Sequence, residues 1–288
     1  MFGIISALLA ASSWTYACFL WRQQTKWFSA LQINIIKNII AFVVFFPALL
    51  IFDFDSSFKA IFILLLSGII GIALGDSFYI TSLKIIGTRR TLTVEAFSPI
   101  CATILGSVIL QEMPSLKVSA GIFIVSISLL GVALHRTKSN QILEANISKM
   151  KGFAFAFLSV LCAVIAATLS RFVLTNSDLN PFQTTEIRLL GGIIGLFPFI
   201  ERDLITSIKK LPSKNKSSLI KATFLGTNLG ILFQQNVFRT LPLGLGWTLL
   251  STSPVISLFV AKEEGEKLDW ETLLLTTMTI FGIGIVLI

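Results

Sequence analysis

The sequence is poor in the residues on which most soluble enzymes depend. It has one histidine, three cysteines and two tyrosines, and charged residues make up only 13% of the chain, about half the share of an ordinary globular domain. The lone His135 argues against histidine metal sites and histidine acid–base catalysis, and the scattered Cys18, Cys101 and Cys162 form neither a metal motif nor a disulfide framework. These shortages exclude a soluble enzyme and a disulfide-stapled secreted domain, and we expect neither a metal nor a cofactor.

Apolar residues are abundant instead, at 54% of 288 residues, with 25 phenylalanines and a mean hydropathy of +0.85. A globule cannot hide so much apolar surface, which leaves an integral membrane protein. A spanning helix needs about 20 mostly apolar residues. We therefore predict an all-α, multi-pass protein with ten transmembrane helices, at residues 2–21, 30–52, 60–80, 91–111, 116–135, 152–172, 182–200, 218–238, 242–261 and 270–288.

The links between these runs are short. The longest, 136–151 and 201–217, are rich in lysine, and we expect both to be loops. No link has room for a nucleotide-binding domain, and the chain has no GxxxxGK[ST] motif, which argues against a pump driven by its own ATPase. The first run lacks a preceding basic segment and an A-x-A site, so we expect a span there and not a cleaved signal peptide.

The chain repeats itself about halfway along. At an offset of 149 residues, Gly3, Ala7, Leu9, Ala17, Leu20 and Arg22 recur as Gly152, Ala156, Leu158, Ala166, Leu169 and Arg171. At an offset of 155 residues, Gly71, Leu74, Gly75, Phe78, Thr93, Ser98 and Pro99 recur as Gly226, Leu229, Gly230, Phe233, Thr248, Ser253 and Pro254.

The repeat gives a first five-helix unit at 1–135, a connecting loop at 136–151 and a second unit at 152–288. Because five is odd, the second unit must enter the membrane from the opposite side. Inverted repeats of this kind are typical of secondary transporters, which alternate between two states around a site near the middle of the membrane. The alternative is an old duplication retained only for folding.

Several segments carry a likeness to a known family: residues 75–87, Ser98-Pro99 and Glu112 in the first half, and residues 239–243, Ser253-Pro254 and Gly265-Glu266 in the second. With these segments and its ten predicted spans, the sequence resembles the drug/metabolite transporter superfamily, and within it the EamA-like ten-helix permeases. The resemblance covers essentially the whole chain. It implies a membrane permease, but it leaves the substrate open, because that branch exports amino acids, metabolites and drugs.

Two basic residues lie inside predicted spans at equivalent places, Lys37 and Arg188, at an offset of 151 residues. Each is about 10 Å from the start of its helix. One interpretation is a snorkelled anchor at the membrane interface. The other is a cation in the cavity that binds an anionic group of the substrate, and its recurrence in both halves favours this second interpretation.

Asp76 and Glu95 are harder to place at an interface, because carboxylate side chains are short. Their counterparts in the second half are Ile231 and Leu250. A requirement of folding that both halves share therefore does not explain the two acids. We predict that both acids couple transport to protons, because a carboxylate in a cavity of low dielectric can bind and release one. The alternative is a structural ion pair with Lys37, and a cluster of all three residues is geometrically possible.

Other residues complete the predicted site. Glu186 is also charged within a span, but it lies two positions from Arg188 and so faces another direction. Pro99 and Pro254 lie in mid-helix and free a carbonyl each, so we predict hinges, with a harmless bend as the alternative. The predicted substrate-binding residues, for several of which core packing is the alternative, are Trp14, Lys37, Tyr79, Glu186, Arg188, Gln234 and Trp247.

We therefore predict a secondary transporter, an exporter or exchanger, of small metabolites such as amino acids, located in the cell membrane. Its predicted partners are a small-molecule substrate and the lipid bilayer, and not nucleic acid, although the net charge is +8. We expect no enzymatic activity. The alternative is a membrane-embedded lipid-modifying enzyme, which would need an acidic D-D-x-x-D cluster or His/Asp pairs, and neither occurs.

The orientation of the chain is predicted differently by two arguments. Lys and Arg residues in short loops favour the cytoplasmic side, and 17 of the 23 fall on the side opposite the termini. This count places both termini outside the cytoplasm, whereas the family resemblance implies both inside. We favour the charge count.

Overall fold

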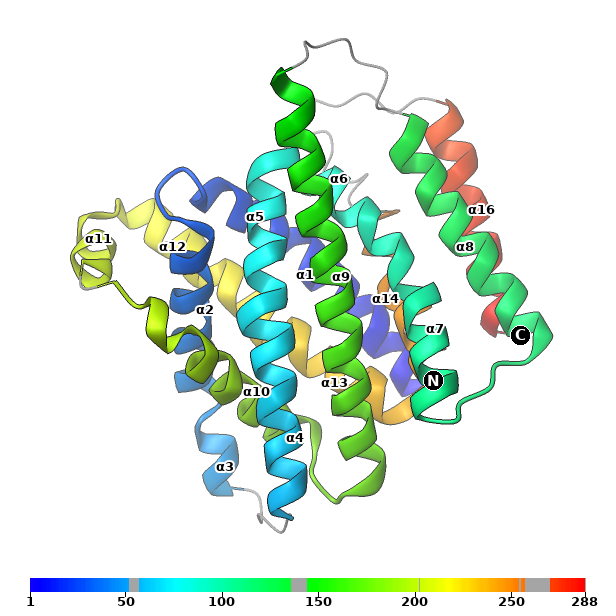
Figure 1. Cartoon of the computed structure of the whole chain (residues 1–288), viewed down its shortest axis with the longest axis horizontal. Helices are drawn as coiled ribbons and strands as arrows, with labels where there is room; N and C mark the ends of the chain where they lie inside the picture. The colour runs from blue at the N-terminus through cyan, green and yellow to red at the C-terminus, as the bar shows by residue number, and fades with distance from the viewer. Residues whose placement is uncertain (52–56, 136–143, 202, 254, 257–269, 288) are drawn as a thin grey trace.

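The structure is a computed structural model that describes residues 1–288 except 52–56, 136–143, 202, 254, 257–269 and 288 (Figure 1). Every regular element among the described residues is helical, as the all-α prediction requires. The elements are α1 (Phe2–Gln24), α2 (Ala30–Phe45), α3 (Pro47–Ile51), α4 (Phe58–Gly68), η1 (Ile69–Gly75), α5 (Asp76–Ile86), α6 (Thr88–Val94), η2 (Glu95–Phe97), α7 (Ser98–Ile109), α8 (Leu116–His135), α9 (Glu144–Asn176), α10 (Pro181–Leu196), η4 (Phe197–Phe199), α11 (Leu204–Lys210), α12 (Ser213–Ala222), η5 (Thr223–Leu229), α13 (Gly230–Thr240), α14 (Leu243–Leu250) and α16 (Trp270–Leu287).

The apolar runs of the sequence form these helices, and five helical stretches of the described chain are long and apolar enough to cross a membrane. They are Phe2–Gln24, Ala30–Ile51, Phe58–Ile86, Arg90–Ile109 and Lys149–Asn176. Their exposed surfaces carry large apolar side chains such as Val43, Phe62 and Val108, which suit lipid. The protein is a multi-pass integral membrane protein. The full count of ten spans stays a prediction, because several expected spans are divided into shorter helices.

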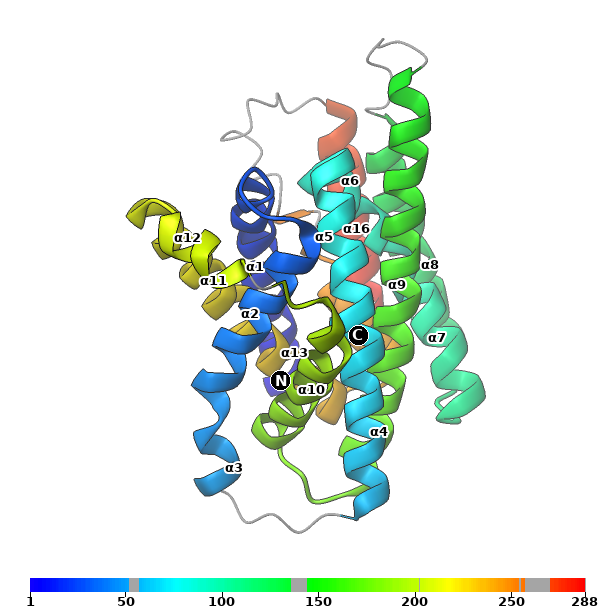
Figure 2. The ribbon, with the colours of Figure 1, turned by 60° about the vertical axis from the view of Figure 1, so that its left-hand side comes forward.

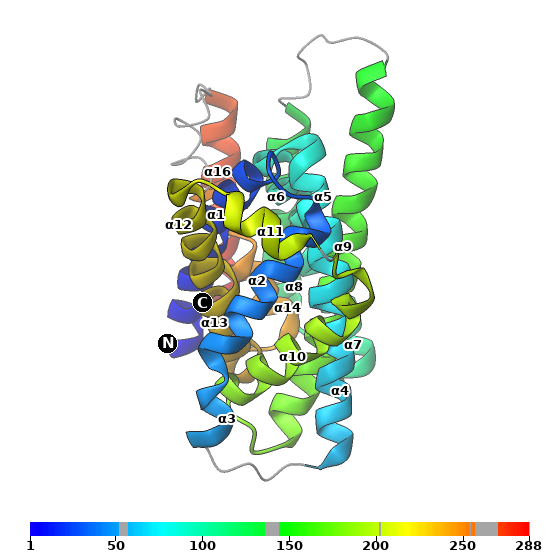
Figure 3. The ribbon, with the colours of Figure 1, turned by 90° about the vertical axis from the view of Figure 1, so that its left-hand side faces the viewer.

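Each half of the chain packs its first helix against the other half, on the helix that follows the π-helical segment there. The first helix of the chain, α1, packs along α13, and α9, the first helix of the second half, packs along α5. The last helices of the halves, α8 and α16, lie side by side at one edge of the bundle, and α7 packs on α14 (Figures 1 and 3). Two similar units related by a two-fold axis make reciprocal contacts of this kind.

Local backbone features recur at matched positions. Both η1 and η5 are π-helical segments, and each leads without a break into an α-helix, α5 or α13. Each segment contains a glycine of the repeated sequence block at a matched position, Gly71 in η1 and Gly226 in η5. A capping box begins α2 at Ser29 and α10 at Asn180, at the offset of 151 residues that also relates Lys37 to Arg188.

Both long links contain helix, which corrects the expectation of loops. Helix α9 already begins at Glu144, within the expected loop 136–151, and α11 and the start of α12 occupy much of 201–217. Figure 2 shows α11 and α12 projecting to one side of the bundle. Leu204 and Leu211 are buried against the core while the lysines between them are exposed, so the amphipathic pattern of this link is sufficient to form a short helix.

The span expected at 91–111 is interrupted at Glu95. There η2, a 3-10 turn, separates α6 from α7, and Pro99 stands in the first turn of α7, where a missing N–H is tolerated. The expectation of a free carbonyl at Glu95 is wrong, because this oxygen accepts the backbone N–H of Ser98 and faces the hydroxyl of Ser251 at 3.5 Å. Pro254, the second predicted hinge, lies outside the described residues.

Candidate functional site

A cavity lies midway along the helices and is lined by both halves of the chain. It comprises about 830 Å³ of space, part of which is continuous with the exterior. Its wall comes from α1, η1, α5, η2, α7, α9, α10, α13 and α14. Seven of the predicted site residues meet there: Trp14, Asp76, Tyr79, Glu95, Arg188, Gln234 and Trp247. Residues separated by up to 233 positions are therefore brought to one place.

Arg188 is the positive group in the cavity wall. It lies on α10, is only 4% exposed, and its Nε and Nη1 atoms have no hydrogen-bond partner among the described residues. A Cβ at Gly71 would lie 3.3 Å from Nη2 of Arg188 and 2.6 Å from the Cβ of Ala166. The glycine of η1 thus leaves room for the guanidinium between two helices. A buried guanidinium needs hydrogen-bond acceptors, so Arg188 brings an unmet demand for acceptors to the cavity wall.

Lys37 has a different environment, although it occupies the equivalent place in the first half. It is fully buried, and its Nζ lies 2.5 Å from Oδ2 of Asp76 and 5.5 Å from the centre of the Trp21 ring. It is therefore not a snorkelled anchor, and it does not line the cavity. Asp76 stands between the Lys37 ammonium and the cavity, with 16% of its side chain exposed.

The π-helical turn next to this ion pair is held by Asn34. The amide nitrogen of Asn34 donates to the carbonyls of Ile72 and Ala73, at 2.8 and 3.2 Å, and to Oγ of Ser77 at 2.8 Å. The amide of Asn38 donates in turn to the Asn34 carbonyl oxygens. These polar side chains fix the segment from which Asp76 projects, so the ion pair rests on a rigid support.

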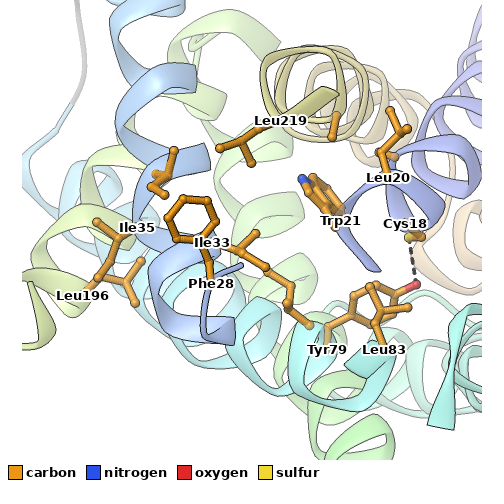
Figure 4. Close-up of a cluster of buried hydrophobic side chains, with 14 of the residues drawn as sticks. Cys18, Leu20, Trp21, Phe28, Ile33, Ile35, Tyr79, Leu83, Leu196 and Leu219 are labelled. Atoms are coloured by element: carbon orange, nitrogen blue, oxygen red, sulfur yellow. Dashed lines mark hydrogen bonds between the residues drawn. The ribbon is translucent and has the colours of Figure 1, made fainter. Parts of the chain in front are cut away.

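Glu95 belongs to a second polar group, together with Trp14, Tyr79 and Cys18. Its side chain interacts with Trp14, whose Nε1 also lies 3.3 Å from the Tyr79 hydroxyl. The same hydroxyl is 3.1 Å from Sγ of Cys18, and Figure 4 shows this contact at the edge of a buried apolar cluster that includes Trp21. No ion pair of the described residues joins Glu95 to Lys37, so the three charged residues divide into a Lys37–Asp76 pair and a separate Glu95.

The second half contributes aromatic and amide groups. Gln234 on α13 and Trp247 on α14 line the cavity, and the Trp247 ring lies 5.9 Å from that of Phe238. Glu186 is buried but does not line the cavity, and neither of its carboxylate oxygens has a partner among the described residues. Arg188 lines the cavity and Glu186 does not, which agrees with the spacing of two residues on α10.

Several lining residues were missed from the sequence. Ser98, Ser159 and Ser253 contribute hydroxyls, and small residues such as Ala10 and Ala163 make the space. Serine and alanine are frequent in membrane helices, so a single sequence does not distinguish the serines and alanines that line a cavity from those that only pack between helices. Ser98 and Ser253 do recur in the repeated block, and that recurrence is the signal that could have found them. Pro99 borders the site through its neighbour Ser98, whereas Glu266 and Pro254 lie outside the described residues.

Comparison with known proteins supplies the family. The sequence model of the EamA-like transporter family matches residues 1–134 and again residues 150–288. The chain belongs to the EamA-like transporter family. Members of this family are membrane transporters of the drug/metabolite type.

Solved structures support the fold of this EamA-like protein. One crystal structure of a protein shares 13% sequence identity with this chain and superposes with a TM-score of 0.67, over 97% of this chain and 96% of that one. Twenty-nine chains of solved structures match in all. No curated protein sequence matches.

Proposed function

We propose that this EamA-like protein is a secondary transporter of small metabolites that carry an anionic group, such as amino acids, and that Arg188 binds that group in the cavity. The observation that carries the proposal is the buried, unpaired guanidinium of Arg188 in the cavity wall. A cation buried without acceptors is costly, and a carboxylate with two oxygens matches the planar fork of an arginine.

The rest of the wall suits an amphipathic solute. Trp14, Tyr79 and Trp247 offer aromatic surface, while Gln234 and the serines offer hydrogen bonds. Asp76 and Glu95 are the acidic groups, and either can hold a proton or a cationic part of the substrate. Asp76 is already engaged by Lys37, so Glu95 is the better candidate for proton exchange.

Alternating access is the mechanism we propose for this site. The family model matches each half of the chain separately, and α1–α13 and α9–α5 are exchanged packing pairs. Two units related by inversion can swap conformations, so that the central cavity faces one side of the membrane and then the other. Pro99, next to the 3-10 turn at Glu95, is the proposed hinge in the described part of the chain.

The test is transport by the purified protein in lipid vesicles. A panel of amino acids and small organic acids is first screened by thermal shift, and the compounds that stabilise the protein are then used, radiolabelled, with and without a pH gradient. We expect Arg188→Gln to lose both stabilisation and uptake. Arg239→Gln removes the same charge from the exposed end of α13 and serves as the control. Equal uptake by Arg188→Gln and the unmodified protein would refute the proposed role of Arg188.

A further inference from the structure

Glu112 is held in an unusual position just after α7. The preceding residue, Gln111, has a φ of +57°, the left-handed region that non-glycine residues rarely occupy. The backbone N–H of Glu112 donates to the carbonyl of Gly106 at 3.0 Å, and Oγ of Ser107 donates to the carbonyl of Glu112 at 3.3 Å. This turn directs the Glu112 side chain back into the protein and away from the membrane surface.

The Glu112 carboxylate binds two elements of the second half. One oxygen accepts from Nε of Arg171 on α9, and the other accepts the backbone N–H of Leu243, at the start of α14, at 2.7 Å. Arg171 also donates from Nη1 to the carbonyl of Phe238, near the end of α13, at 2.5 Å. We name Glu112, Arg171, Phe238 and Leu243 the Glu112 cluster. Its charged side chains are 19% and 10% exposed, so the cluster is largely shielded from water.

The Glu112 cluster lies beyond the cavity toward the end of the bundle that holds the termini. Within the cluster, α7 and α14 are in contact: a Cβ at Gly106 would lie 3.4 Å from the Cβ of Leu243 and 3.6 Å from Oε2 of Glu112. Phe238 of the cluster contacts Trp247, and Trp247 lines the cavity. The cluster therefore holds the ends of α7, α9, α13 and α14 together, and the Phe238–Trp247 pair connects it to the cavity wall.

We propose that Glu112 and Arg171 form a gate that closes the cavity toward the end with the termini and opens once in each transport cycle. This inference rests on the proposed function, because a gate has meaning only in a transporter. The chemistry suits reversible opening. In the closed state the two charges satisfy each other and the first N–H of α14, and in the open state water reaches both, so neither state leaves a bare buried charge.

The first test links the two helices covalently. The Cβ separation at Gly106 and Leu243 is close to that of natural disulfides, which have Cβ atoms about 3.5–4.5 Å apart. Gly106→Cys and Leu243→Cys are combined in a background in which the three native cysteines are replaced by alanine. We expect oxidation to stop uptake, a reductant to restore it, and thermal stabilisation by the transported compound to survive. The two single-cysteine variants, treated with the same oxidant, are the controls. Full uptake by the crosslinked protein would overturn the proposal.

The second test needs no substrate. Leu243 is fully buried, so the thiol of Leu243→Cys reacts with a water-soluble maleimide only when α14 separates from α7. Adding Glu112→Gln and Arg171→Gln together avoids leaving one charge buried alone, and we expect the labelling rate to rise by about tenfold or more. Asp178→Asn with Lys117→Gln removes an exposed acid and an exposed base at the same end, and should leave the rate unchanged.

The outcomes separate the gate from the transport proposal. An unchanged labelling rate in the Glu112→Gln/Arg171→Gln variant would overturn the gate, whatever the protein transports. A faster rate in a protein that moves none of the screened compounds would support the opening of this end and would count against the proposed substrate class alone.

Discussion

Lys37 and Arg188 occupy equivalent positions in the two halves of the chain, but only Lys37 has an acidic partner. Its Nζ lies 2.5 Å from Asp76, whereas Nε and Nη1 of Arg188 have no hydrogen-bond partner in the described structure. The first half thus neutralises its buried cation internally, and the second half leaves its cation facing the cavity. The two equivalent positions therefore have different roles: Lys37 forms an ion pair, and Arg188 lines the cavity without an acidic partner among the described residues. We assign substrate binding to Arg188 for this reason.

The first prediction concerns Glu95. Glu95→Gln should abolish uptake driven by a pH gradient while leaving the unfolding temperature nearly unchanged, because no ion pair of the described structure involves Glu95. Uptake into vesicles with imposed pH differences provides the measurement. Gradient-driven uptake at the normal rate in this variant would rule out Glu95 as the proton carrier.

Asp76→Asn should behave differently, because it leaves the fully buried Lys37 without its partner. We expect a loss of about 3–5 kcal/mol in the free energy of unfolding. Lys37→Gln combined with Asp76→Asn removes both charges and should recover most of that stability. If the double variant also recovers gradient-driven uptake, the pair is structural. If stability returns without uptake, Asp76 has a role in coupling.

A third prediction tests the space that Gly71 leaves for Arg188. In Gly71→Ala the added methyl meets Ala166 and crowds the guanidinium, and we expect a loss of about 1–3 kcal/mol together with weaker substrate binding. The matched control is Gly284→Ala in α16, because a Cβ there has no atom within 4 Å. Thermal unfolding in detergent compares the two variants. Equal stability would show that η1 adjusts to the extra carbon.

Pro99 provides a test of the hinge. Pro99→Ala permits a continuous α-helix from α6 into α7 in place of the 3-10 turn. We expect turnover to fall more than thermal stabilisation by the transported compound. Unchanged turnover would favour the harmless bend.

Orientation in the membrane can be measured at α12. Ser213 is exposed at the start of that helix, among the lysines at 209–216. The excess of basic residues at this end predicts that it lies in the cytoplasm. Ser213→Cys should then resist an impermeant thiol reagent in intact cells and react after lysis. Ready labelling in intact cells would establish the reverse orientation, which the family resemblance implies.

Much of the architecture could be predicted from the sequence, because hydropathy shows where the helices lie and the internal repeat shows how the chain divides into two halves. The apolar runs locate the helices, and the rarity of charge inside them singled out Asp76, Glu95 and Arg188, which do meet at one cavity. The pairing of Lys37 with Asp76 was one of two predicted alternatives. Sequence could not choose between them, because the rotation of α2 relative to α5 depends on packing of the whole bundle.

Other features depend on backbone geometry that hydropathy does not encode. Hydropathy marks an apolar run as helical but does not give the winding of the helix, so η1 and η5 were expected to be ordinary α-helix. The amphipathic α11 was expected to be a loop, because its seven residues are too few for a clear period. Glu112 was noted only as part of a family motif, since its partners Arg171 and Leu243 are 59 and 131 residues away in the chain.

The π-helical turn of η1 has a consequence for how the chain tolerates insertions and deletions. A π-helical turn holds about one residue more than an α-helical turn, because its hydrogen bonds span five residues instead of four. Deleting one residue within 69–75 would therefore return the segment to α-helical winding with little change in where Asp76 and Tyr79 face. The same deletion in an α-helical part of the span would turn all the residues that follow by about 100°. At this point in the protein, the chain carries one residue that it can lose.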